Sequence, residues 1–346
     1  MSLKIIKAGI LDTVQDMGRY GHQHLGINPG GVMDRFTACI ANILVGNNKE
    51  AAVIELHFPA SVFLFEKESI IAVAGADFTP VINGEKIPLL HPVVVNKNSV
   101  LQFQKAESAT RCYLAVSGGL DINKWLNSYS TNLKAAAGGY NGRALQKDDV
   151  INLKKEFSFL PAGHEKDFMV LPWKANDNCR PAGLARQSHA KAGQAGSPEP
   201  GERIAVISGH EWDVLTDETK NLFLNQAFVI TFASDRMGYR LYGPALPAVK
   251  YDELVSSPVS FGTIQLLPDG QLIILMADHQ TTGGYPKIAH VISSHLSQLA
   301  QMRPGEKIRF ELTDQQTAEN LFLQQHRHLQ QLENACKFKL EEFFKE

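Results

Sequence analysis

Short apolar segments separated by turn residues run through the first third of the chain. Their lengths and their Val, Ile and Phe content predict strands at residues 53–58, 61–65, 70–75, 92–96, 100–103 and 111–116. Between two further apolar segments, 80–82 and 86–87, the dipeptide Asn83-Gly84 predicts a tight hairpin, because both residues readily adopt positive φ angles. This part of the chain is therefore predicted to be mainly β.

Strand-like segments also dominate the second half, at residues 203–208, 228–233, 262–267 and 271–277. They do not alternate regularly with helices, so a Rossmann-type sheet is excluded. A turn followed by alternating apolar positions recurs at residues 97–103, 147–153 and 304–310. Two of these copies close the two halves of the chain, which predicts two similar β-barrel domains.

Helical spacing of apolar residues is found in few places. One helix is predicted from about Met33 to Val45, and a short one follows the N-cap residue Thr216. A third is predicted to begin near Pro286, because apolar residues then recur at helical spacing, at Ile288, Ile292, Leu296 and Leu299. The last is predicted to start at Thr313, where Thr313 and Gln316 fit a capping box.

Residues 174–203 change in character, since they are rich in Ala, Gly, Ser and Pro without periodicity. We place the domain boundary there. The predicted organisation is an N-terminal β-barrel domain at 1–165, a linker region at 166–202, a C-terminal β-barrel domain at 203–312 and a C-terminal helix at 313–346.

Chain length, net charge and the number of cysteines narrow the possible classes of function. The chain has 346 residues and a formal net charge of −2, so it lacks the basic surface expected of a protein that binds nucleic acid or an anionic membrane. The start of the chain is too charged for a secretory signal, and we expect a cytoplasmic protein. The four cysteines are far apart, which predicts buried free thiols at Cys39, Cys112, Cys179 and Cys336.

Known catalytic and metal motifs are missing from the sequence. His290 and His295 would lie about 140° apart on the predicted helix and could not share a metal ion, so no metal site is predicted and His295 is interpreted as a core residue. Ser117-Gly118-Gly119-Leu120-Asp121 is similar to a phosphate loop of ATP pyrophosphatases, but an ordinary turn is favoured. A serine hydrolase is excluded because the sequence contains no Gly-x-Ser-x-Gly.

The stretch from Asp278 to Pro286 is the first candidate site. It follows an apolar strand and precedes the predicted helix, so Asp278, Gln280, Thr281 and Thr282 would lie at a helix N-terminus, where free backbone N–H groups favour oxygen ligands. A plain turn with threonine caps and flexible glycines is the alternative. Further polar residues in both halves complete the candidate set: Asp235, Arg236, Tyr239, Arg240, Gly283, Gly284, Tyr285, Asp34 and Asp77. Buried ion pairs and turn hydrogen bonds would also need residues of these types.

Six motifs together resemble a known family. They lie at residues 12–19, 29–34, 75–77, 234–241, 262–265 and 280–286. From about residue 4 to 312 the chain resembles the family formed by the C subunit of bacterial 5-oxoprolinase, also labelled allophanate hydrolase subunit 2, biotin-dependent carboxyltransferase and kinase-inhibitor antagonist. It departs from that pattern at His279, where Arg is usual, at residues 256–258, where Ser-Glu-Gly is usual, and at Asp148, where Gly is usual.

The resemblance implies a mainly β fold with a few helices, arranged as two cyclophilin-like β-barrel domains in one chain. It implies partner subunits B and A and the ATP-dependent opening of 5-oxoproline to glutamate, with ATP bound by the complex, on this chain or another subunit. No biotin is expected on this chain, because it has no Met-Lys-Met attachment motif. Two alternatives remain: a carboxyltransferase component acting on a urea- or amide-like acceptor, and a non-enzymatic regulator that binds a partner similar to the B subunit.

Roles for the candidate residues follow from their chemistry. Asp278 or Asp235 could orient the attacking water or the ring N–H. Thr281 and Thr282, with the glycines that follow them, could hold the developing oxyanion, and Gln280 is a further catalytic candidate. Arg236 and Arg240 suit a substrate carboxylate or a phosphate. The remaining candidates would contribute to the substrate-binding surface: Tyr239, Gly283, Gly284, Tyr285, Asp34 and Asp77.

Overall fold

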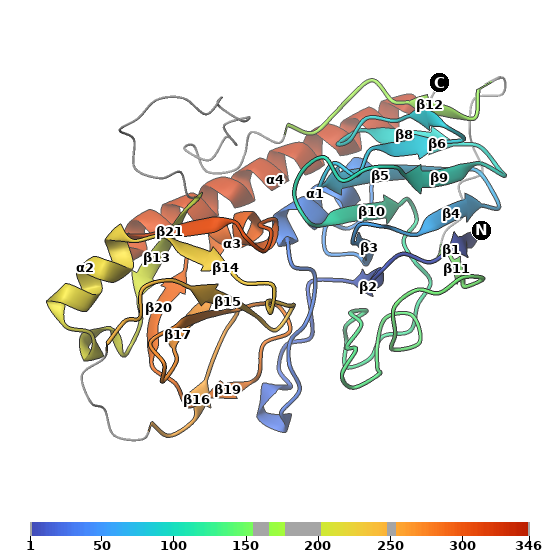
Figure 1. Cartoon of the computed structure of the whole chain (residues 1–346). Coiled ribbons are helices and arrows are strands. Elements are labelled where there is room, and N and C mark those ends of the chain that lie inside the picture. Colours follow the sequence, from blue (N-terminus) through green and yellow to red (C-terminus); the bar gives the residue numbers. More distant parts are fainter. Residues whose placement is uncertain (1, 155–165, 177–201, 248–253, 345–346) are drawn as a thin grey trace. The chain divides into compact units, whose positions relative to one another are not determined.

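The computed structural model describes residues 2–154, 166–176, 202–247 and 254–344 (Figure 1). The chain divides into two compact units. Unit 1 comprises Met1–Tyr20, Gly30–Asp177 and His326–Glu346, and unit 2 comprises Gly21–Pro29 and Asn178–Gln325. The predicted linker falls mostly on residues outside the described ranges, so the domain bounds stay a prediction.

Unit 1 contains two six-stranded sheets in which all paired strands are antiparallel. The first runs in the order β11 (Val150–Asn152), β1 (Ser2–Lys7), β4 (Val62–Phe65), β9 (Val100–Phe103), β6 (Pro80–Ile82) and β7 (Glu85–Lys86). The second runs in the order β12 (Phe168–Val170), β8 (Pro92–Val95), β5 (Ser69–Gly75), β10 (Cys112–Val116), β3 (Val53–Leu56) and β2 (Thr13–Gln15). The predicted strands and the Asn83-Gly84 hairpin are confirmed within a few residues.

Alternate residues of both sheets share one hydrophobic core. Leu3 and Ile5 of β1 are fully buried in it, as are Ile71 and Val73 of β5. Because strand side chains alternate between faces, this pattern indicates two layers packed face to face. The described strands of unit 1 form two separate sheets, so the prediction of a second closed barrel is not confirmed.

Helix α1 (Arg35–Leu44) covers the other face of the second sheet, where it packs against β5 and β10. Asp34 caps it, since Asp34 Oδ1 accepts a hydrogen bond from Thr37 N at 3.0 Å. Gly46 follows its C-terminus with a φ of 73°, as expected of a helix stop. The predicted helix is confirmed. Its packing explains why β5 is buried on both faces.

Unit 2 contains a closed seven-stranded barrel. Its order is β13 (Glu202–Ser208), β20 (Lys287–Val291), β17 (Thr263–Leu266), β18 (Leu272–Leu275), β15 (Gly238–Tyr242), β14 (Phe228–Ile230) and β21 (Lys307–Leu312). The parallel pair β13–β21 closes the ring, while the other pairs are antiparallel. A two-stranded sheet, β16 (Ser257–Pro258) with β19 (Thr282–Gly283), lies outside the ring. The mainly β fold class is confirmed.

The remaining helices are short except for the last. They are η1 (Gln23–Leu25), η2 (Trp212–Val214), α2 (Asp217–Asn225), α3 (Ser293–Ala300) and α4 (Gln315–Phe343). Thr216 caps α2 as predicted, because its hydroxyl accepts from Thr219 N at 3.2 Å. Within the described ranges no helix is long and apolar enough to span a bilayer.

The predicted helix at Pro286 is wrong. Residues Lys287–Val291 form strand β20, and the helix α3 begins only at Ser293. β20 pairs with β13 on one side and β17 on the other, so long-range ladder hydrogen bonds override the local helical spacing. His290 lies in the strand and His295 in α3, so the predicted placement of both histidines on one helix is also wrong.

Two further predictions concern the last helix and the cysteines. The N-terminus of α4 is capped by Asp314, whose Oδ1 accepts from Thr317 N at 2.7 Å, so the Thr313 capping box is wrong. Cys39, Cys112 and Cys336 are buried free thiols, as predicted, while Cys179 lies outside the described residues. Burial raises the pKa of Cys39 to about 12, which keeps this thiol protonated and unreactive near neutral pH.

Candidate functional site

Asp278 and Arg236 form a bidentate ion pair in unit 2. Asp278 Oδ2 accepts from Arg236 Nε at 2.9 Å, and Asp278 Oδ1 accepts from Arg236 Nη2 at 3.1 Å. The pair is mostly enclosed, with 8% of the Arg236 side chain and 17% of the Asp278 side chain exposed. Two parallel hydrogen bonds from a planar guanidinium fix the orientation of the carboxylate.

The barrel wall brings these two residues together. Arg236 precedes β15 and Asp278 follows β18, and these strands are paired. The ladder continues past both strands, because Asp278 N donates to Arg236 O at 2.8 Å. Asn28 Nδ2 also donates to Asp278 O at 3.0 Å, which ties the early segment of unit 2 to the same loop.

The neighbouring candidates on β15 and in the turn before it have different environments. Asp235 is exposed, and its Oδ1 closes a turn by accepting from Met237 N at 2.8 Å and Gly238 N at 3.2 Å. Tyr239 is 3% exposed, while Arg240, the next residue along the strand, is exposed. The structure thus separates the predicted set into the enclosed pair of Arg236 with Asp278, the buried Tyr239, and the exposed Asp235 and Arg240.

Two amide side chains lie next to the loop after Asp278. Gln280 Nε2 donates to Gln265 Oε1 at 3.4 Å, and Gln265 Nε2 donates to Tyr285 O at 3.3 Å. Gln265 is 1% exposed on β17. A Cβ on Gly283 would lie 2.4 Å from Gln265 Nε2, so a side chain at this position would push the Gln265 amide away from its present place. The Gly283 position therefore serves packing of the site.

The threonines do not lie at a helix mouth. Thr282 and Gly283 form β19, which pairs with β16, and Thr281 O accepts from Val259 N at 3.2 Å. Because β20 follows this stretch, the predicted oxyanion site at a helix N-terminus after Pro286 is wrong. Gly284 lies against the Ser256 hydroxyl, at 3.3 Å from an added Cβ, and the Tyr285 side chain is 43% exposed.

Lys287 and Glu211 were missed by the sequence analysis. The Lys287 side chain is 9% exposed, and its Nζ lies 3.8 Å from Glu211 Oε1. Glu211 Oε2 accepts from Lys287 N at 2.9 Å, which holds the carboxylate beside the strand. Within the described part of the chain Lys287 Nζ makes no hydrogen bond. The available signal was a lysine directly before the apolar residues Ile288 and Ala289.

These residues form what we call the Asp278 cluster: Arg236, Asp278, Gln280, Gln265, Lys287 and Glu211. Gln265 and Lys287 are register partners on β17 and β20, and Gln280 connects Gln265 to the Asp278 loop. The cluster offers two carboxylates, a guanidinium, two amides and an ammonium group. Such a set can bind a small polar ligand through carbonyl and carboxylate oxygens.

Two histidines of this unit form hydrogen bonds with backbone groups. His279 is 2% exposed, and its Nδ1 lies 2.6 Å from Gln280 O. His295 accepts a hydrogen bond from Ala205 N at Nδ1, and burial lowers its pKa to about 4, so it is a neutral core residue as predicted. Among the described residues no three His, Cys, Asp or Glu side chains are grouped closely enough to hold a metal ion.

The two candidate residues in unit 1 both accept hydrogen bonds from nearby backbone N–H groups. Asp34 caps α1, and its Oδ2 also accepts from the Thr37 hydroxyl at 2.7 Å. Asp77 Oδ1 accepts from Thr79 N at 2.8 Å, where Thr79 has a φ of 50°. These contacts are sufficient to explain an aspartate at either position.

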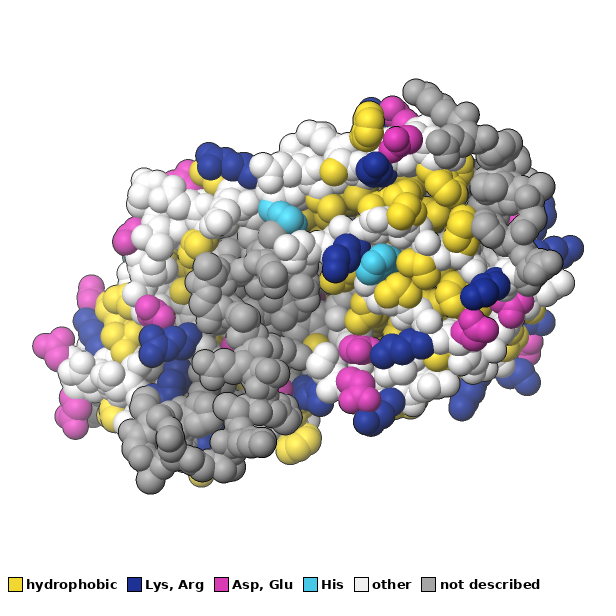
Figure 2. Space-filling model, turned by 90° about the horizontal axis from the view of Figure 1, so that it is seen from above, with side chains coloured by type: hydrophobic (Ala, Val, Ile, Leu, Met, Phe, Trp, Pro, Cys, Tyr) yellow, Lys and Arg dark blue, Asp and Glu magenta, His cyan; other side chains and the backbone are white. Residues whose placement is uncertain are grey.

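Figure 2 shows Lys and Arg side chains mixed with Asp and Glu on the face that it presents, with no large basic patch. This distribution agrees with a formal net charge of −2. A ligand would thus be recognised by the local chemistry of a site and not by a broad surface potential.

Comparison with known proteins identifies a matching family model and several related proteins. A family model described as carboxyltransferase domain, subdomain A and B, matches residues 25–312. The C subunit of 5-oxoprolinase from Haemophilus influenzae is 32% identical over 322 residues, which cover 92% of this chain and 94% of that protein. The C subunit of 5-oxoprolinase from Escherichia coli is 32% identical over 336 residues, which cover 95% and 97%.

A solved structure extends the comparison. The K. lactis urea amidolyase superposes with a TM-score of 0.82 at 28% sequence identity. The match covers 96% of this chain but 20% of that one. The chain thus matches the two 5-oxoprolinase subunits over nearly their whole length, and it matches one part of the much longer urea amidolyase.

Proposed function

Because the chain belongs to the family of carboxyltransferase-domain proteins that includes the C subunit of 5-oxoprolinase, we propose that it is one subunit of an ATP-dependent 5-oxoprolinase. In this proposal the complex adds water across the lactam bond of 5-oxo-L-proline and releases L-glutamate. Subunits A and B are the proposed partners, and the reaction is proposed to take place in the cytoplasm.

The observation that carries this proposal is the extent of the match. At 32% identity the matched region covers 94% and 97% of the C subunits of two 5-oxoprolinases. A chain that matches these subunits over nearly their whole length is suited to take the same place in a complex of separate subunits.

The Asp278 cluster supplies groups that suit a lactam carboxylate as substrate. We propose that Gln265, Gln280 and Lys287 bind the carbonyl and carboxylate oxygens, since amide N–H and ammonium groups are hydrogen-bond donors. Asp278 would accept the ring N–H or orient the water, and Arg236 would position Asp278 through its two hydrogen bonds. This reverses part of the sequence interpretation, in which Arg236 bound the substrate directly.

ATP is proposed to act in the assembled complex. A lactam is stabilised by resonance, so coupling to ATP would make the carbonyl carbon more reactive. The 117–121 segment does not supply a nucleotide loop in this proposal, because the Ser117 hydroxyl donates to Val45 O and Gly118 N donates to Asn47 Oδ1, contacts that belong to a structural turn. A nucleotide site on a partner subunit is therefore preferred.

The test is glutamate release from 5-oxoproline with ATP. We expect no turnover by the isolated chain and turnover when the A and B subunits encoded with it are added. Omission of this chain should abolish activity of the mixture. Full turnover by A and B without it, or by this chain alone, would contradict the proposal.

The fold similarity favours a second candidate, a carboxyltransferase component. The domain match and the TM-score of 0.82 to the K. lactis urea amidolyase support it. This function needs carboxybiotin from another protein and an acceptor such as urea. Transfer of labelled carboxyl from carboxybiotin to urea by this chain with its partner, without glutamate release, would establish this candidate in place of the first.

A further inference from the structure

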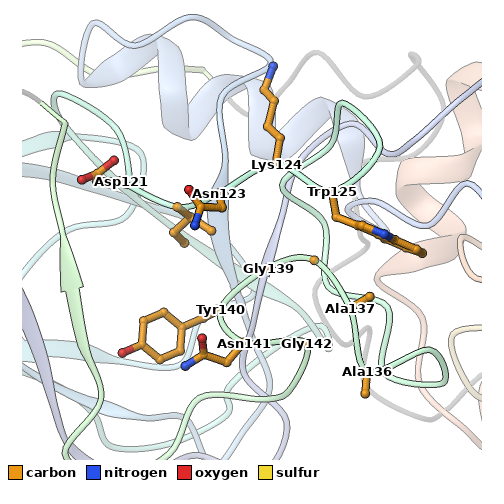
Figure 3. Close-up of a pocket in the computed structure, with 12 residues that line it drawn as sticks. Asp121, Asn123, Lys124, Trp125, Ala136, Ala137, Gly139, Tyr140, Asn141 and Gly142 are labelled. Atoms are coloured by element: carbon orange, nitrogen blue, oxygen red, sulfur yellow. The ribbon is translucent and has the colours of Figure 1, made fainter.

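Unit 1 contains an open cavity of about 340 Å³ that the proposed function does not use (Figure 3). Its walls come from two loop segments, residues 121–125 and 136–142. The second segment includes what we call the glycine turn, residues 138–142, in which Gly142 N donates to Gly138 O at 2.8 Å. That hydrogen bond closes the turn and leaves the residues between its ends to line the cavity.

The glycine turn contributes backbone donors to the wall of this cavity. The N–H groups of Gly139, Tyr140 and Asn141 have no hydrogen-bond partner within the described part of the chain. Gly139 and Asn141 have positive φ angles of 53° and 55°, while Tyr140 between them does not. Alternation of this kind turns successive N–H groups toward one side and makes a concavity that binds anions.

The side chains around the turn add further donors. Asn123 and Asn141 both line the cavity, and neither amide has a hydrogen-bond partner among the described residues. Figure 3 shows Asn123, Tyr140 and Asn141 on one side of the glycine turn, while Lys124 and Trp125 extend in other directions. The Tyr140 hydroxyl donates to Val150 O at 3.2 Å, which anchors that ring.

Charge at the cavity is nearly balanced. Lys124 contributes an ammonium group, which lies 5.0 Å from the centre of the Tyr129 ring, and Asp121 contributes a carboxylate. Figure 3 shows the Asp121 carboxylate pointing away from the glycine turn. The glycine-turn N–H groups and the Asn123 and Asn141 amides thus supply donors without partners among the described residues, and a ligand rich in acceptor oxygens would satisfy them.

The glycine turn leaves no room for a side chain at Gly138 or Gly139. A Cβ on Gly139 would lie 1.8 Å from Thr131 Oγ1, and one on Gly138 would lie 2.3 Å from Ser130 O. Ser130 in turn is fixed by Asp16, whose Oδ1 accepts from the Ser130 hydroxyl at 2.6 Å. The backbone donors of the turn are thus held in place before any ligand arrives, which reduces the entropy cost of binding.

We propose that this cavity is a binding site for a small molecule bearing an oxyanion, a carboxylate or a phosphate, which the glycine-turn N–H groups and the Asn123 and Asn141 amides hold. The inference is independent of the proposed enzymatic function, because it concerns residues of unit 1 that have no role there. Carboxylates and phosphates share the chemistry that the donors recognise, and separate probes distinguish them.

The test is calorimetric titration of the full chain at low salt with inorganic phosphate and, separately, with acetate. We expect saturable binding of at least one probe. Asn141→Gly keeps the positive φ and removes the amide, so it should weaken binding about tenfold, the effect of losing one hydrogen bond to a charged group. Asn123→Ala should act in the same direction.

Matched variants separate this site from general effects. Asn127→Gly is the control for Asn141→Gly, because Asn127 is exposed with a φ of 62° but does not line the cavity.

Lys124→Met should weaken binding and Asp121→Asn should strengthen it, each about twofold to threefold, whereas Lys134→Met should have no effect. Phosphate binding alone identifies a phosphate site, and acetate binding alone a carboxylate site. Absence of saturable binding by both probes, or equal binding by Asn141→Gly and the unaltered chain, would overturn the proposal.

Discussion

The ion pair between Arg236 and Asp278 is the best-defined interaction of the candidate site. Its two hydrogen bonds, at 2.9 and 3.1 Å, hold a carboxylate beside a loop that also contains Gln280. A mostly buried ion pair can contribute to stability, to catalysis or to both. Removing either partner destabilises the protein because the remaining charge is buried and poorly solvated. Stability and turnover must therefore be measured together.

We predict that Asp278→Asn lowers glutamate release by the assembled complex about 10²–10⁴-fold, the usual contribution of a general acid or base. Arg236→Lys should also lower turnover, because lysine keeps the charge but loses the planar fork that orients the carboxylate. Unfolding in urea should show a loss of about 1–3 kcal/mol for each variant.

The control for this experiment is Asp269→Asn. Asp269 is exposed and closes a turn by accepting from Gln271 N at 3.0 Å, so it matches the substitution without touching the cluster. If Asp278→Asn unfolds like the unaltered chain and turns over at the same rate, Asp278 has no role in the reaction and the site lies on a partner subunit.

Asp12 provides a prediction about pH. Burial raises the pKa of its carboxyl to about 6 from the ordinary 3.8, although backbone N–H groups of His57 and Ser61 donate to it. The folded state therefore holds the proton more tightly than the unfolded state. The resulting stabilisation is fully present below pH 3.8 and is lost as the pH rises through 6, an amount of about 3 kcal/mol.

The measurement is the free energy of unfolding in urea between pH 4 and 7. Relative to Asp12→Asn, which cannot ionise, the unaltered chain should lose stability across this interval. Asp148→Asn is the control, since Asp148 is exposed and its φ of 69° suits asparagine. Parallel pH curves for Asp12→Asn and the unaltered chain would show that the buried carboxyl does not titrate in this range.

At the level of secondary-structure elements, the N-terminus of helix α1 accounts for the hydrogen bonds of Asp34. The sequence analysis assigned Asp34 to substrate binding, while the structure shows both carboxylate oxygens engaged with Thr37 at the helix start. We predict that Asp34→Ala costs about 1–2 kcal/mol of unfolding free energy, as is typical for loss of an N-cap. Asp34→Asn, which keeps an acceptor, should cost less.

Kinetics of the complex test the same residue. If Asp34 only caps α1, the KM for 5-oxoproline should be the same in Asp34→Asn and the unaltered complex. A raised KM with an unchanged unfolding free energy would instead return Asp34 to the substrate-binding set.

The strand β20 shows where element prediction failed. Ile288 and Ile292 fit helical spacing, but the first lies in the strand and the second precedes α3. The same residues can satisfy either period when the window is short. What decided the outcome was pairing with β13 and β17, which are distant from β20 in the sequence. Because Lys287–Val291 form a strand, the candidate site lacks the helix N-terminus that the sequence predicted.

The chain as a whole combines a β sandwich and a closed barrel in its two units. Barrel closure depends on β13 and β21, which pair in parallel although they lie at opposite ends of the barrel sequence. Turn residues and apolar alternation predict where strands occur, but not which strands become neighbours. The similarity to the C subunit of 5-oxoprolinase was reached from motifs because those are contiguous in the sequence.

Local signals were sufficient for the strands of unit 1, the Asn83-Gly84 hairpin and the cap at Thr216. Each of these depends on residues close together in the chain, so its energetics are largely contained in a short window. The candidate list likewise contained Arg236, Asp278 and Gln280, because polar residues at strand ends are visible in sequence.

Tertiary structure decided which of those candidates meet. Arg236 pairs with Asp278 across 42 residues, Gly283 makes room for Gln265, and Glu211 faces Lys287 across 76 residues. None of these contacts has a local sequence signature, because each arises only when paired strands place distant residues side by side. Burial then determines which charged groups need partners, and burial is a property of the packed barrel rather than of any segment.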